Sequence, residues 1–211
     1  MRVGAILLAA GESRRFGGTV SKLFSPLGEK EVYRHAYDTM IESDLFDEII
    51  LVTSDKRPMK GAVMGGNTRQ ESCYQGLLAC NQVDFVVIHD AARPFLSYEI
   101  LKRNIDAVVK HNAINTCIPS YDTINFVSNE KIDSIPNRST CWRGQTPQSF
   151  SYDLILEAHQ RAKDKNAFDD CSLVLDMGHP VHVVLGSNKN LKITTPIDLA
   201  FAKALLYTAV N

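Results

Sequence analysis

The chain has 211 residues, enough for one domain with a full hydrophobic core, and its formal net charge is −1 at pH 7. A charge so near zero provides no strong field for nucleic acid or for an anionic membrane, and we expect neither as a partner. No apolar run reaches membrane-spanning length and Met1-Arg2 leads directly into an expected strand, so we predict a cytoplasmic protein without a signal peptide. The five cysteines are scattered and odd in number, which is typical of reduced thiols rather than of disulfides or a zinc site.

Short apolar runs alternate with helical patterns along most of the chain. In chain order, we expect strands at residues 3–8, 48–53, 59–64, 84–88, 114–118 and 181–185. The expected helices cover residues 31–43, 69–79, 97–110, 153–163, a stretch that begins near residue 170, and 197–206. This alternation predicts an α/β fold of the Rossmann-like type, with a mostly parallel sheet covered by helices on both faces. We expect a single domain over residues 1–211.

One segment interrupts the alternation of strands and helices. Between about residues 120 and 141, extended stretches with alternating apolar residues flank a turn at Ser128–Lys131, which predicts an inserted β-hairpin. A lone hairpin is marginally stable in water, so this segment needs a surface to pair with. We expect an arm that pairs with a second copy of the chain in a homodimer. A hairpin that folds back on its own subunit is the alternative.

The loop after the first strand combines small residues with positive charge. The small residues are Ala9, Ala10 and Gly11, and the cations that follow are Arg14, Arg15 and Lys22. Small side chains let a ligand approach the backbone, and cations favour a polyphosphate. The segment matches neither the Walker A pattern nor the dinucleotide fingerprint, so an ordinary solvated surface loop is the alternative.

A second polar segment, Gly65–Ser72, follows the expected strand at residues 59–64. Its two glycines precede a helix and allow close approach of a ligand to the backbone. Asn67 and Ser72 can hydrogen-bond a base, which makes the segment a candidate nucleotide contact.

Two more polar segments follow later strands, at the edge of the sheet where α/β proteins bind ligands. Asp90 and Arg93 leave a buried strand together, with a structural ion pair between them as the alternative. Lys192 stands just before the last helix, and taken alone it is more typical of a solvated lysine. His89 is more typical of a packed strand-end histidine than of a catalyst.

In this order, the segments resemble the 2-C-methyl-D-erythritol 4-phosphate cytidylyltransferase family, and the resemblance covers nearly the whole chain. The matching motifs are Leu8–Gly11 with Arg15 and Lys22, Gly65–Ser72, His89–Pro94, Asp122-Thr123, Gln145–Phe150 and Asn190–Thr194. The resemblance implies an enzyme that transfers CMP from CTP to 2-C-methyl-D-erythritol 4-phosphate and releases pyrophosphate, in non-mevalonate isoprenoid biosynthesis.

The resemblance also implies a role for individual residues. Cytidine would be held by the backbone around Ala9, Ala10, Gly11 and Gly66, with Asn67 and Ser72. The catalytic residues would be Arg15 and Lys22 on the triphosphate, Lys192 on the attacking phosphate, and Arg138, which would reach across the dimer. The sugar phosphate would contact Asp90, Arg93 and Thr123. Mg²⁺ is the implied cofactor, held by the CTP phosphates or by Asp90.

These residue types suit the implied reaction. The attacking phosphate oxygen is already ionised at neutral pH, so no general base is needed, and catalysis would consist of positioning and charge stabilisation. The sequence departs from the family pattern at Ser13, at Ser21 and Leu23 beside the catalytic lysine, and at Phe168. These departures leave open another polyol phosphate, such as ribitol 5-phosphate, as the substrate. A non-catalytic nucleotide-binding subunit is a further alternative.

Overall fold

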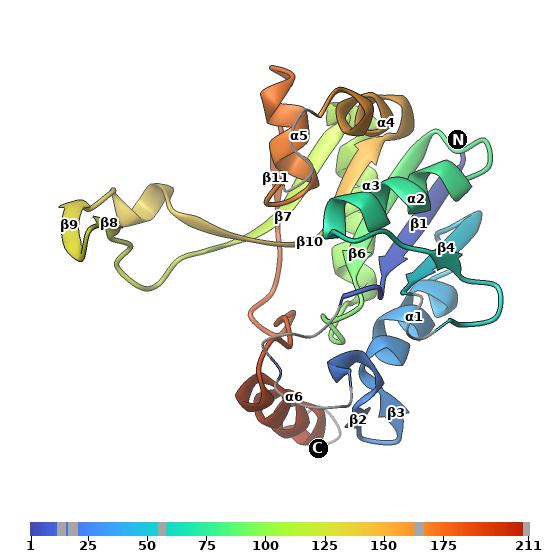
Figure 1. Ribbon diagram of the computed structural model, residues 1–211, viewed down its shortest axis with the longest axis horizontal. Helices are drawn as coiled ribbons and strands as arrows, with labels where there is room; N and C mark the ends of the chain where they lie inside the picture. Colours follow the sequence, from blue (N-terminus) through green and yellow to red (C-terminus); the bar gives the residue numbers. More distant parts are fainter. Residues whose placement is uncertain (12–15, 17–20, 55–57, 163–166, 209–211) are drawn as a thin grey trace.

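The computed structural model describes residues 1–11, 16, 21–54, 58–162 and 167–208 (Figure 1). Its centre is a seven-stranded sheet in the order β11-β7-β10-β6-β1-β4-β5. The strands are β1 (Val3–Leu8), β4 (Glu48–Thr53), β5 (Val63–Met64), β6 (Phe85–Asp90), β7 (Ala113–Pro119), β10 (Trp142–Ser151) and β11 (His182–Leu185). Strand β10 runs antiparallel to both of its neighbours, whereas the other neighbouring pairs in this sheet are parallel. The expected mostly parallel sheet is confirmed.

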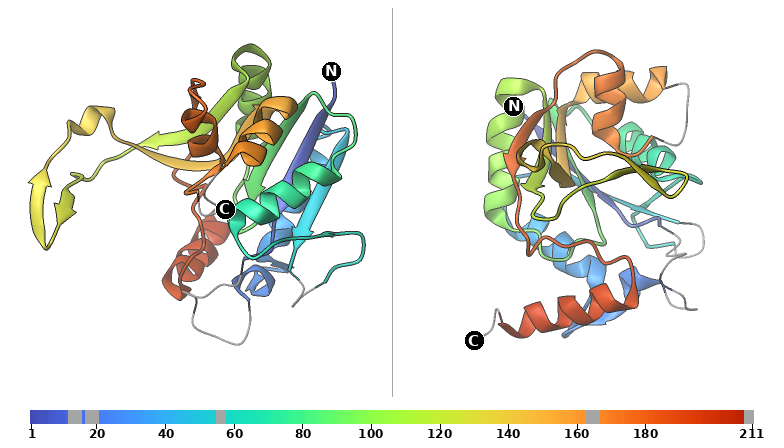
Figure 2. Two further views of the ribbon diagram at one scale, coloured as in Figure 1. Left: turned by 45° about the horizontal axis from the view of Figure 1, so that its top comes forward. Right: turned by 90° about the vertical axis from the view of Figure 1, so that its left-hand side faces the viewer.

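Helices cover both faces of this sheet. They are α1 (Val32–Glu42), α2 (Arg69–Ala79), α3 (Tyr98–His111), α4 (Tyr152–Arg161) and α5 (Asp170–Asp176). The last helix, α6 (Pro196–Thr208), packs instead beside the segment Pro26–Leu27, at the lower end of the body in Figure 1. Alternate residues of β1 contribute to two separate cores: Val3, Ala5 and Leu7 pack with α1 and α3, while Ile6 and Leu8 pack with α2 and α4. In the right-hand view of Figure 2, α3 (light green) and α4 (orange) lie on opposite sides of the sheet. A strand that is buried on both faces requires the continuous apolar run seen in the sequence.

The order of the strands creates a switch point beside β1. From β1 the chain passes to β4 on one side and returns to β6 on the other side, with Leu8 opposite both Val52 and Asp90. The loops after β1 and β6 therefore leave the same edge of the sheet and diverge. Open α/β sheets bind ligands in the crevice formed at such a point.

Two features differ from the elements expected from the sequence. The strand expected at residues 59–64 is restricted to Val63–Met64, and β10 was not expected. Strand β10 holds Pro147, a poor residue for a central strand, and its register shifts between Gly144 and Gln148. A small hairpin of β2 (Pro26–Leu27) and β3 (Lys30–Glu31) follows the short helix η2 (Lys22–Phe24) and was also not expected.

The expected inserted hairpin is confirmed and extends away from the body as an arm, residues 120–141 (Figures 1 and 2). It consists of β8 (Phe126–Ser128), β9 (Lys131–Ser134) and the short helix η3 (Arg138–Thr140). Asn129 and Glu130 between the two strands have positive φ angles of 47° and 63°, as a tight two-residue hairpin turn requires. Every residue of β8 and β9 is exposed in the single chain. Pairing of this arm with a second copy stays a prediction.

Two global expectations have a structural counterpart. All five cysteines are free thiols, as their scattered positions in the sequence predict. Within the described residues, no helix is both long enough and apolar enough to cross a bilayer.

Candidate active site

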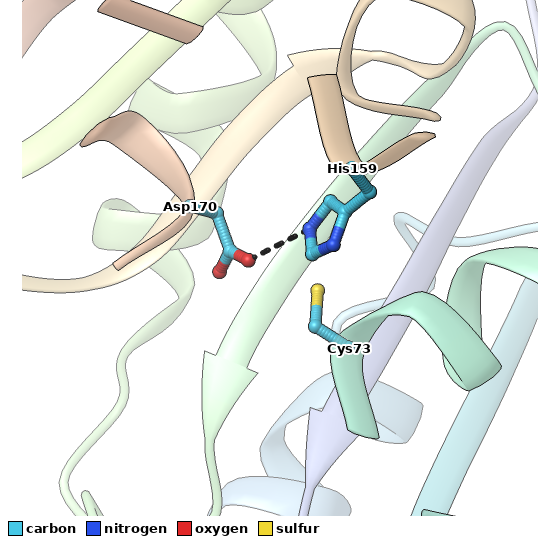
Figure 3. Close-up of side chains that lie close together, drawn as sticks. All are labelled: Cys73, His159 and Asp170. Carbon is cyan, nitrogen blue, oxygen red and sulfur yellow. Dashed lines mark hydrogen bonds and ion pairs between the residues drawn. The ribbon is translucent and has the colours of Figure 1, made fainter. Parts of the chain in front are cut away.

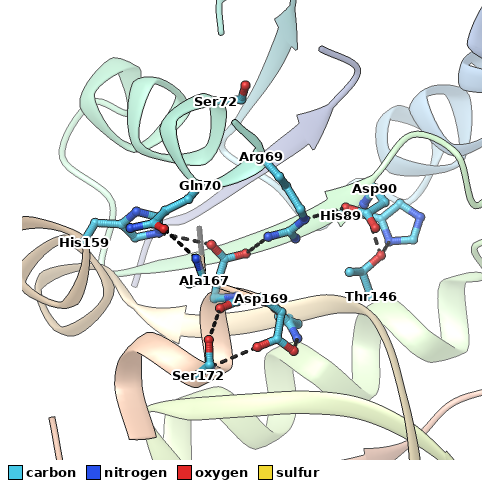
Figure 4. Close-up of polar contacts among 12 residues, drawn as sticks. Arg69, Gln70, Ser72, His89, Asp90, Thr146, His159, Ala167, Asp169 and Ser172 are labelled. Atoms are coloured by element: carbon cyan, nitrogen blue, oxygen red, sulfur yellow. Dashed lines mark hydrogen bonds and ion pairs between the residues drawn. The ribbon is translucent and has the colours of Figure 1, made fainter. Parts of the chain in front are cut away.

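Asp90 is the centre of a charged cluster at the carboxyl edge of the sheet. It is the last residue of β6 and is 7% exposed. Arg69 Nε donates to its Oδ1 at 3.1 Å, and Lys192 Nζ donates to its Oδ2 at 2.7 Å (Figure 4 shows the arginine contact). Burial alone would raise the pKa of Asp90, but the positive charges of Arg69, Lys192 and Arg93 hold it well below its usual range. Asp90 is therefore a fixed negative charge surrounded by cations.

Lys192 is held against Asp90 by the loop that precedes α6. Ile193 N–H donates to the Ala92 carbonyl at 2.8 Å, which ties this loop to the turn after β6. The lysine side chain remains 38% exposed, so its ammonium is accessible to a ligand as well as to Asp90. The alternative of a merely solvated lysine is wrong, since Lys192 forms a close ion pair.

Arg93 is buried in the same turn and faces the same loop. Its Nη1 donates to the Asn190 carbonyl at 2.8 Å, while its Nε has no hydrogen-bond partner among the described residues. Burial lowers the pKa of Arg93, although Asp90 opposes that effect. The ion pairs of Asp90 are with Arg69 and Lys192, so the alternative of an Asp90–Arg93 ion pair is not formed. That Nε is itself buried, so what Arg93 adds to this edge is its positive charge, which favours an anionic ligand nearby.

His89 shapes the turn that carries Asp90 and Arg93. Its Nε2 lies 3.2 Å from the Arg93 carbonyl and must donate to it, so Nδ1 accepts from Thr146 Oγ1 at 3.0 Å. Thr146 Oγ1 in turn accepts from the Asp90 N–H at 3.1 Å. Burial lowers the pKa of His89 to about 4, so the ring is neutral at neutral pH. The structure confirms His89 as a packed residue at a strand end.

The turn after β1 and the turn before α2 pack directly against each other. A Cβ on Gly65 would lie 2.8 Å from Ala10 Cβ and 2.7 Å from Ser72 Oγ, so a side chain there would clash. Ala9 is buried and anchored by its N–H to the Val52 carbonyl at 2.7 Å, whereas Gly11 is exposed. The expected juxtaposition of two small-residue turns is present at the switch point.

The start of α2 organises the remaining nucleotide candidates. Thr68 caps the helix by accepting from Glu71 N–H at 3.0 Å, and Glu71 Oε2 accepts from Asn67 N–H at 2.8 Å, a variant of the capping box. Ser72 is 3% exposed, and its hydroxyl donates to the Thr68 carbonyl at 2.8 Å. Gly66 and Asn67 are exposed, so a ligand can approach this turn, although the Asn67 N–H is already bonded to Glu71. Ser72 holds the turn in place.

The other predicted site residues lie elsewhere. Lys22 is in η2, near Asp198 at the start of α6. Burial would raise the pKa of Asp198, but hydrogen bonds from Thr195 and Thr194 lower it, and the charge of Lys22 adds to their effect. Arg15 lies outside the described residues. Thr123 and Arg138 are in the arm, and Arg138 Nη1 donates to the Tyr121 carbonyl at 3.1 Å. The arm points away from the body, so a single chain does not bring these two residues to Asp90 (Figure 1).

A second charged group lies behind Arg69 and was not identified in the sequence as part of a site. Arg69 Nη1 donates to Asp170 Oδ2 at 2.7 Å, and His159 Nε2 lies 3.1 Å from Asp170 Oδ1. Burial would raise the pKa of Asp170, but Arg69 and His159 hold it well below its usual range. Arg69 belongs to a motif that the sequence analysis singled out, and Asp170 begins an expected helix. His159 lies inside a regular helical pattern and gave no signal.

Cys73, His159 and Asp170 have ligand atoms within 4.8 Å of one another, a spacing that could hold a metal ion (Figure 3). Both carboxylate oxygens of Asp170 are already occupied, one by the Arg69 guanidinium. Burial raises the pKa of the Cys73 thiol well above its usual value, which disfavours the thiolate form that binds metals. A neighbouring guanidinium also repels a cation, so this group fits an ion-pair network better than a metal centre.

Known proteins share both the sequence and the fold of this chain. The sequence model of the family described as 2-C-methyl-D-erythritol 4-phosphate cytidylyltransferase (IspD) matches residues 3–208. A protein of that name from Syntrophotalea carbinolica is 37% identical over an alignment of 227 positions, gaps included, which covers 99% of this chain and 97% of the relative. Another of the same name, from Clostridioides difficile, is 35% identical over 95% of this chain and 92% of its own length.

Two solved structures superimpose closely. The 4-diphosphocytidyl-2C-methyl-D-erythritol synthase of Anaerococcus prevotii gives a TM-score of 0.86 at 30% identity and covers 98% of this chain and 96% of its own. The 2-C-methyl-D-erythritol 4-phosphate cytidylyltransferase of Thermus thermophilus gives a TM-score of 0.84 at 31% identity and covers 98% of this chain and 100% of its own. Because the family model matches residues 3–208 and a relative is 37% identical over 99% of this chain, the chain belongs to the 2-C-methyl-D-erythritol 4-phosphate cytidylyltransferase family.

Proposed function

We propose that this chain transfers CMP from CTP to 2-C-methyl-D-erythritol 4-phosphate, giving 4-diphosphocytidyl-2-C-methyl-D-erythritol and pyrophosphate. The observation that carries the proposal is the Asp90–Lys192 ion pair at the switch point, with Lys192 still open to an anionic ligand. Beside it, the small-residue turns at Ala10 and Gly65 lie close together, with Gly11 and Gly66 exposed. The names of the relatives, matched over nearly the full chain, give the substrates.

The turns at Ala9–Gly11 and Gly65–Asn67 are the proposed cytidine site. Gly11, Gly66 and Asn67 are exposed within these turns, and small residues there let the edge of a base approach the backbone. Because Gly65 is in contact with Ala10, the two turns close one side of this site, and a small pyrimidine fits such a space better than a purine. Ser72 supports the site by holding the Thr68 and Gly66 carbonyls.

Lys192 and Arg93 are the proposed contacts of the attacking phosphate. An oxygen of that phosphate attacks the α-phosphorus of CTP and forms the new P–O bond. The bond from the α-phosphorus to the bridging oxygen breaks, and pyrophosphate leaves with the electron pair. No proton has to move, so the protein contributes orientation and positive charge. Lys22, with Arg15, is proposed to stabilise the charge that develops on the triphosphate.

Mg²⁺ is the proposed cofactor, with Asp90 as its candidate protein ligand. Mg²⁺ in nucleotide sites is commonly held by one or two carboxylates plus substrate phosphates, so a single carboxylate at this edge is compatible with it. When bound, the ion would offset part of the triphosphate charge. Since Asp90 already accepts from Arg69 and Lys192, its share in holding the ion depends on what CTP supplies.

We also propose a homodimer in which the arm of each chain completes the site of the other. The exposed apolar side chains of the arm support this pairing: Phe126, Val127, Ile132 and Ile135 are 57–59% exposed. Thr123 and Arg138, carried on the same arm, would then contact the partner's sugar phosphate. The free thiols suit a reducing compartment, and we propose the cytoplasm.

Pyrophosphate release from CTP tests the proposed function. The purified protein is incubated with CTP, Mg²⁺ and either 2-C-methyl-D-erythritol 4-phosphate or ribitol 5-phosphate, and Lys192→Ala serves as the site control. We expect release with the first polyol phosphate and little with the second, with CTP preferred over ATP. Preference for ribitol 5-phosphate would change the substrate assignment, and no release with either would reject the activity.

A further inference from the structure

A row of buried side chains connects helix α4 to the edge of the sheet that carries Asp90. His159 on α4 pairs with Asp170 at 3.1 Å, Asp170 pairs with Arg69 at 2.7 Å, and Arg69 pairs with Asp90 at 3.1 Å. Lys192 completes the row at 2.7 Å from the second Asp90 oxygen. Figure 3 shows the first of these contacts and Figure 4 shows the contact of Arg69 with Asp90. The row joins five segments of the chain and ends at the proposed phosphate site.

Arg69 bridges two carboxylates with different nitrogens of one guanidinium. Its Nε faces Asp90 and its Nη1 faces Asp170. A guanidinium is a rigid planar fork, so a carboxylate that fixes one edge also fixes the direction of the other edge. With Arg69 on Oδ1 of Asp90, Oδ2 is left to Lys192. The orientation of Arg69 thus determines which Asp90 oxygen receives the lysine.

Asp170 is itself buried and is held by further hydrogen bonds. It is the first residue of α5 and 1% exposed, and its N–H donates to Gln148 Oε1 at 3.2 Å. His159 is 8% exposed and stacks on Tyr74, with ring centroids 6.0 Å apart. Asp170, itself bonded to His159, therefore holds Arg69 through Nη1 and leaves Nε to Asp90.

A buried carboxylate is costly unless its partners fix it well, and apolar residues of similar size often serve the core equally well. An acid at position 170 therefore needs a reason beyond packing. Its two oxygens are both directed by charge or hydrogen bonding, one to Arg69 and one to His159. By holding Arg69 Nη1, Asp170 also fixes the direction of the Arg69 Nε–H, which donates to Asp90 at the site.

We propose that Asp170 and His159 are positioning residues for the phosphate-transfer site: they orient Arg69 so that it holds the Asp90 carboxylate in register with Lys192. The inference rests on the proposed function, because it assigns these residues to the same site. Neither residue contacts substrate in this arrangement. Their effect passes through Arg69.

Steady-state kinetics of Asp170→Asn and His159→Gln give the first test. Asp170→Asn should lower kcat by about 10- to 100-fold, the range for groups that orient an active-site residue, with the KM for CTP within about twofold of wild type. His159→Gln should lower kcat by less than about tenfold, since Asp170 can still pair with Arg69. Glu157→Gln, which removes an exposed partner of Arg161 on the same helix α4, is the matched control and should match wild type. Wild-type kcat in both test variants overturns the proposal.

A mutant cycle separates positioning from a general structural role. If Asp170 acts through Arg69 on Asp90, Asp170→Asn should cause little further loss when Asp90 is already Asn. An effect of equal size in both backgrounds would mean that Asp170 supports the fold alone, and the proposal would be wrong. If Asp170→Asn does not fold, Arg69→Lys takes its place in the cycle, because one ammonium cannot bridge both carboxylates in the way a guanidinium does.

The NMR signal of the Arg69 Nε–H gives a readout that does not depend on activity. In the wild type this proton is bonded to Asp90 and should exchange slowly with water; it should exchange faster in His159→Gln and in Asp170→Asn, but not in Glu157→Gln. Unchanged exchange in both test variants overturns the positioning role. A wild-type protein that turns over no polyol phosphate, yet shows the expected exchange pattern, would reject the proposed activity and leave the ordering of Arg69 established.

Discussion

The carboxyl edge of the sheet and the arm differ in how far the side chains find partners within the same chain. At the edge, Asp90 is 7% exposed and each of its oxygens accepts from a cation of the same chain. In the arm, Phe126 and Ile132 are 57% and 58% exposed, and both strands of the hairpin are exposed throughout. The edge is thus built by one chain, whereas the arm keeps apolar surface for which the same chain offers no cover in the described residues.

This difference indicates where a second chain is needed. A lone hairpin with exposed apolar residues is marginally stable in water unless another surface covers it. Lys192 and Asp90 are positioned without any such help. We therefore expect changes at the edge to act within one subunit and changes in the arm to act on the neighbouring subunit.

The sharpest test of this comparison combines Lys192→Ala with Arg138→Ala. Each variant alone should be inactive, the first because its own site lacks the lysine and the second because the neighbouring site lacks the arginine. After subunit exchange, half of the dimers are mixed and one of their two sites is complete, so about a quarter of wild-type activity should return. Pyrophosphate release before and after exchange measures it, and exchange is verified by mass. Exchanged mixtures that stay inactive would contradict a shared site.

Lys22→Ala tests a proposed catalytic residue that lies on the body, outside the arm. Loss of one group that stabilises charge in the transition state lowers turnover by about 10²- to 10³-fold, and we expect that loss here. The melting temperature should change little, because Lys22 lies in a short helix of three residues at the surface of the body. Turnover and melting are measured on the same preparation. Near-normal turnover would remove Lys22 from the proposed catalytic residues.

The pH dependence of stability tests whether His89, the residue before Asp90 at the edge of the sheet, is buried and neutral within a single chain. His89 has a pKa of about 4 in the folded chain and about 6.5 when unfolded. Between these values the unfolded chain binds more protons, so the neutral His89 stabilises the fold above pH 6.5, and this stabilisation is lost as pH falls towards 4. The shift corresponds to roughly 3 kcal/mol.

Urea unfolding of wild type and His89→Gln at pH 7, 5.5 and 4.5 measures this effect. The wild type should lose stability over the series, and the variant, although less stable at pH 7, should lose less of it. If the free energy of unfolding falls equally with pH in the two proteins, His89 does not titrate as its burial implies.

The fold could be predicted from sequence wherever apolar periodicity was regular. The strands at Val3–Leu8 and Glu48–Thr53 have the expected bounds, because both are short, mostly apolar runs. Strand β10 was missed because Gln145, Thr146 and Gln148 are polar yet buried, and Pro147 interrupts the run. Polar residues in a buried strand are recognisable only once their hydrogen-bond partners from other strands are known.

The site divides in the same way. Motifs placed Asp90, Arg93 and Lys192 near one another, but the ion pair between Asp90 and Lys192 joins residues 102 positions apart and follows only from the fold. The pairing of His159 with Asp170 could not be inferred, because His159 occupies an apolar-face position of a helix. Spacing along the chain carries no information on which buried charges face each other across two helices.

The smallest expected change in the stability of the body comes from the arm. Ile132→Ser should abolish the dimer, because it places a hydroxyl in the surface that the second copy would cover. Ile132 is 58% exposed in the single chain, so unfolding of the body should change by no more than about 0.5 kcal/mol. Ile41→Ser is the matched control: Ile41 is 52% exposed on α1 of the body, outside the arm, and its loss should leave the dimer intact. Light scattering coupled to size exclusion measures the mass of each variant at micromolar concentration. A dimeric Ile132→Ser, or a monomeric wild type, would show that the exposed face of the arm is not the contact between copies.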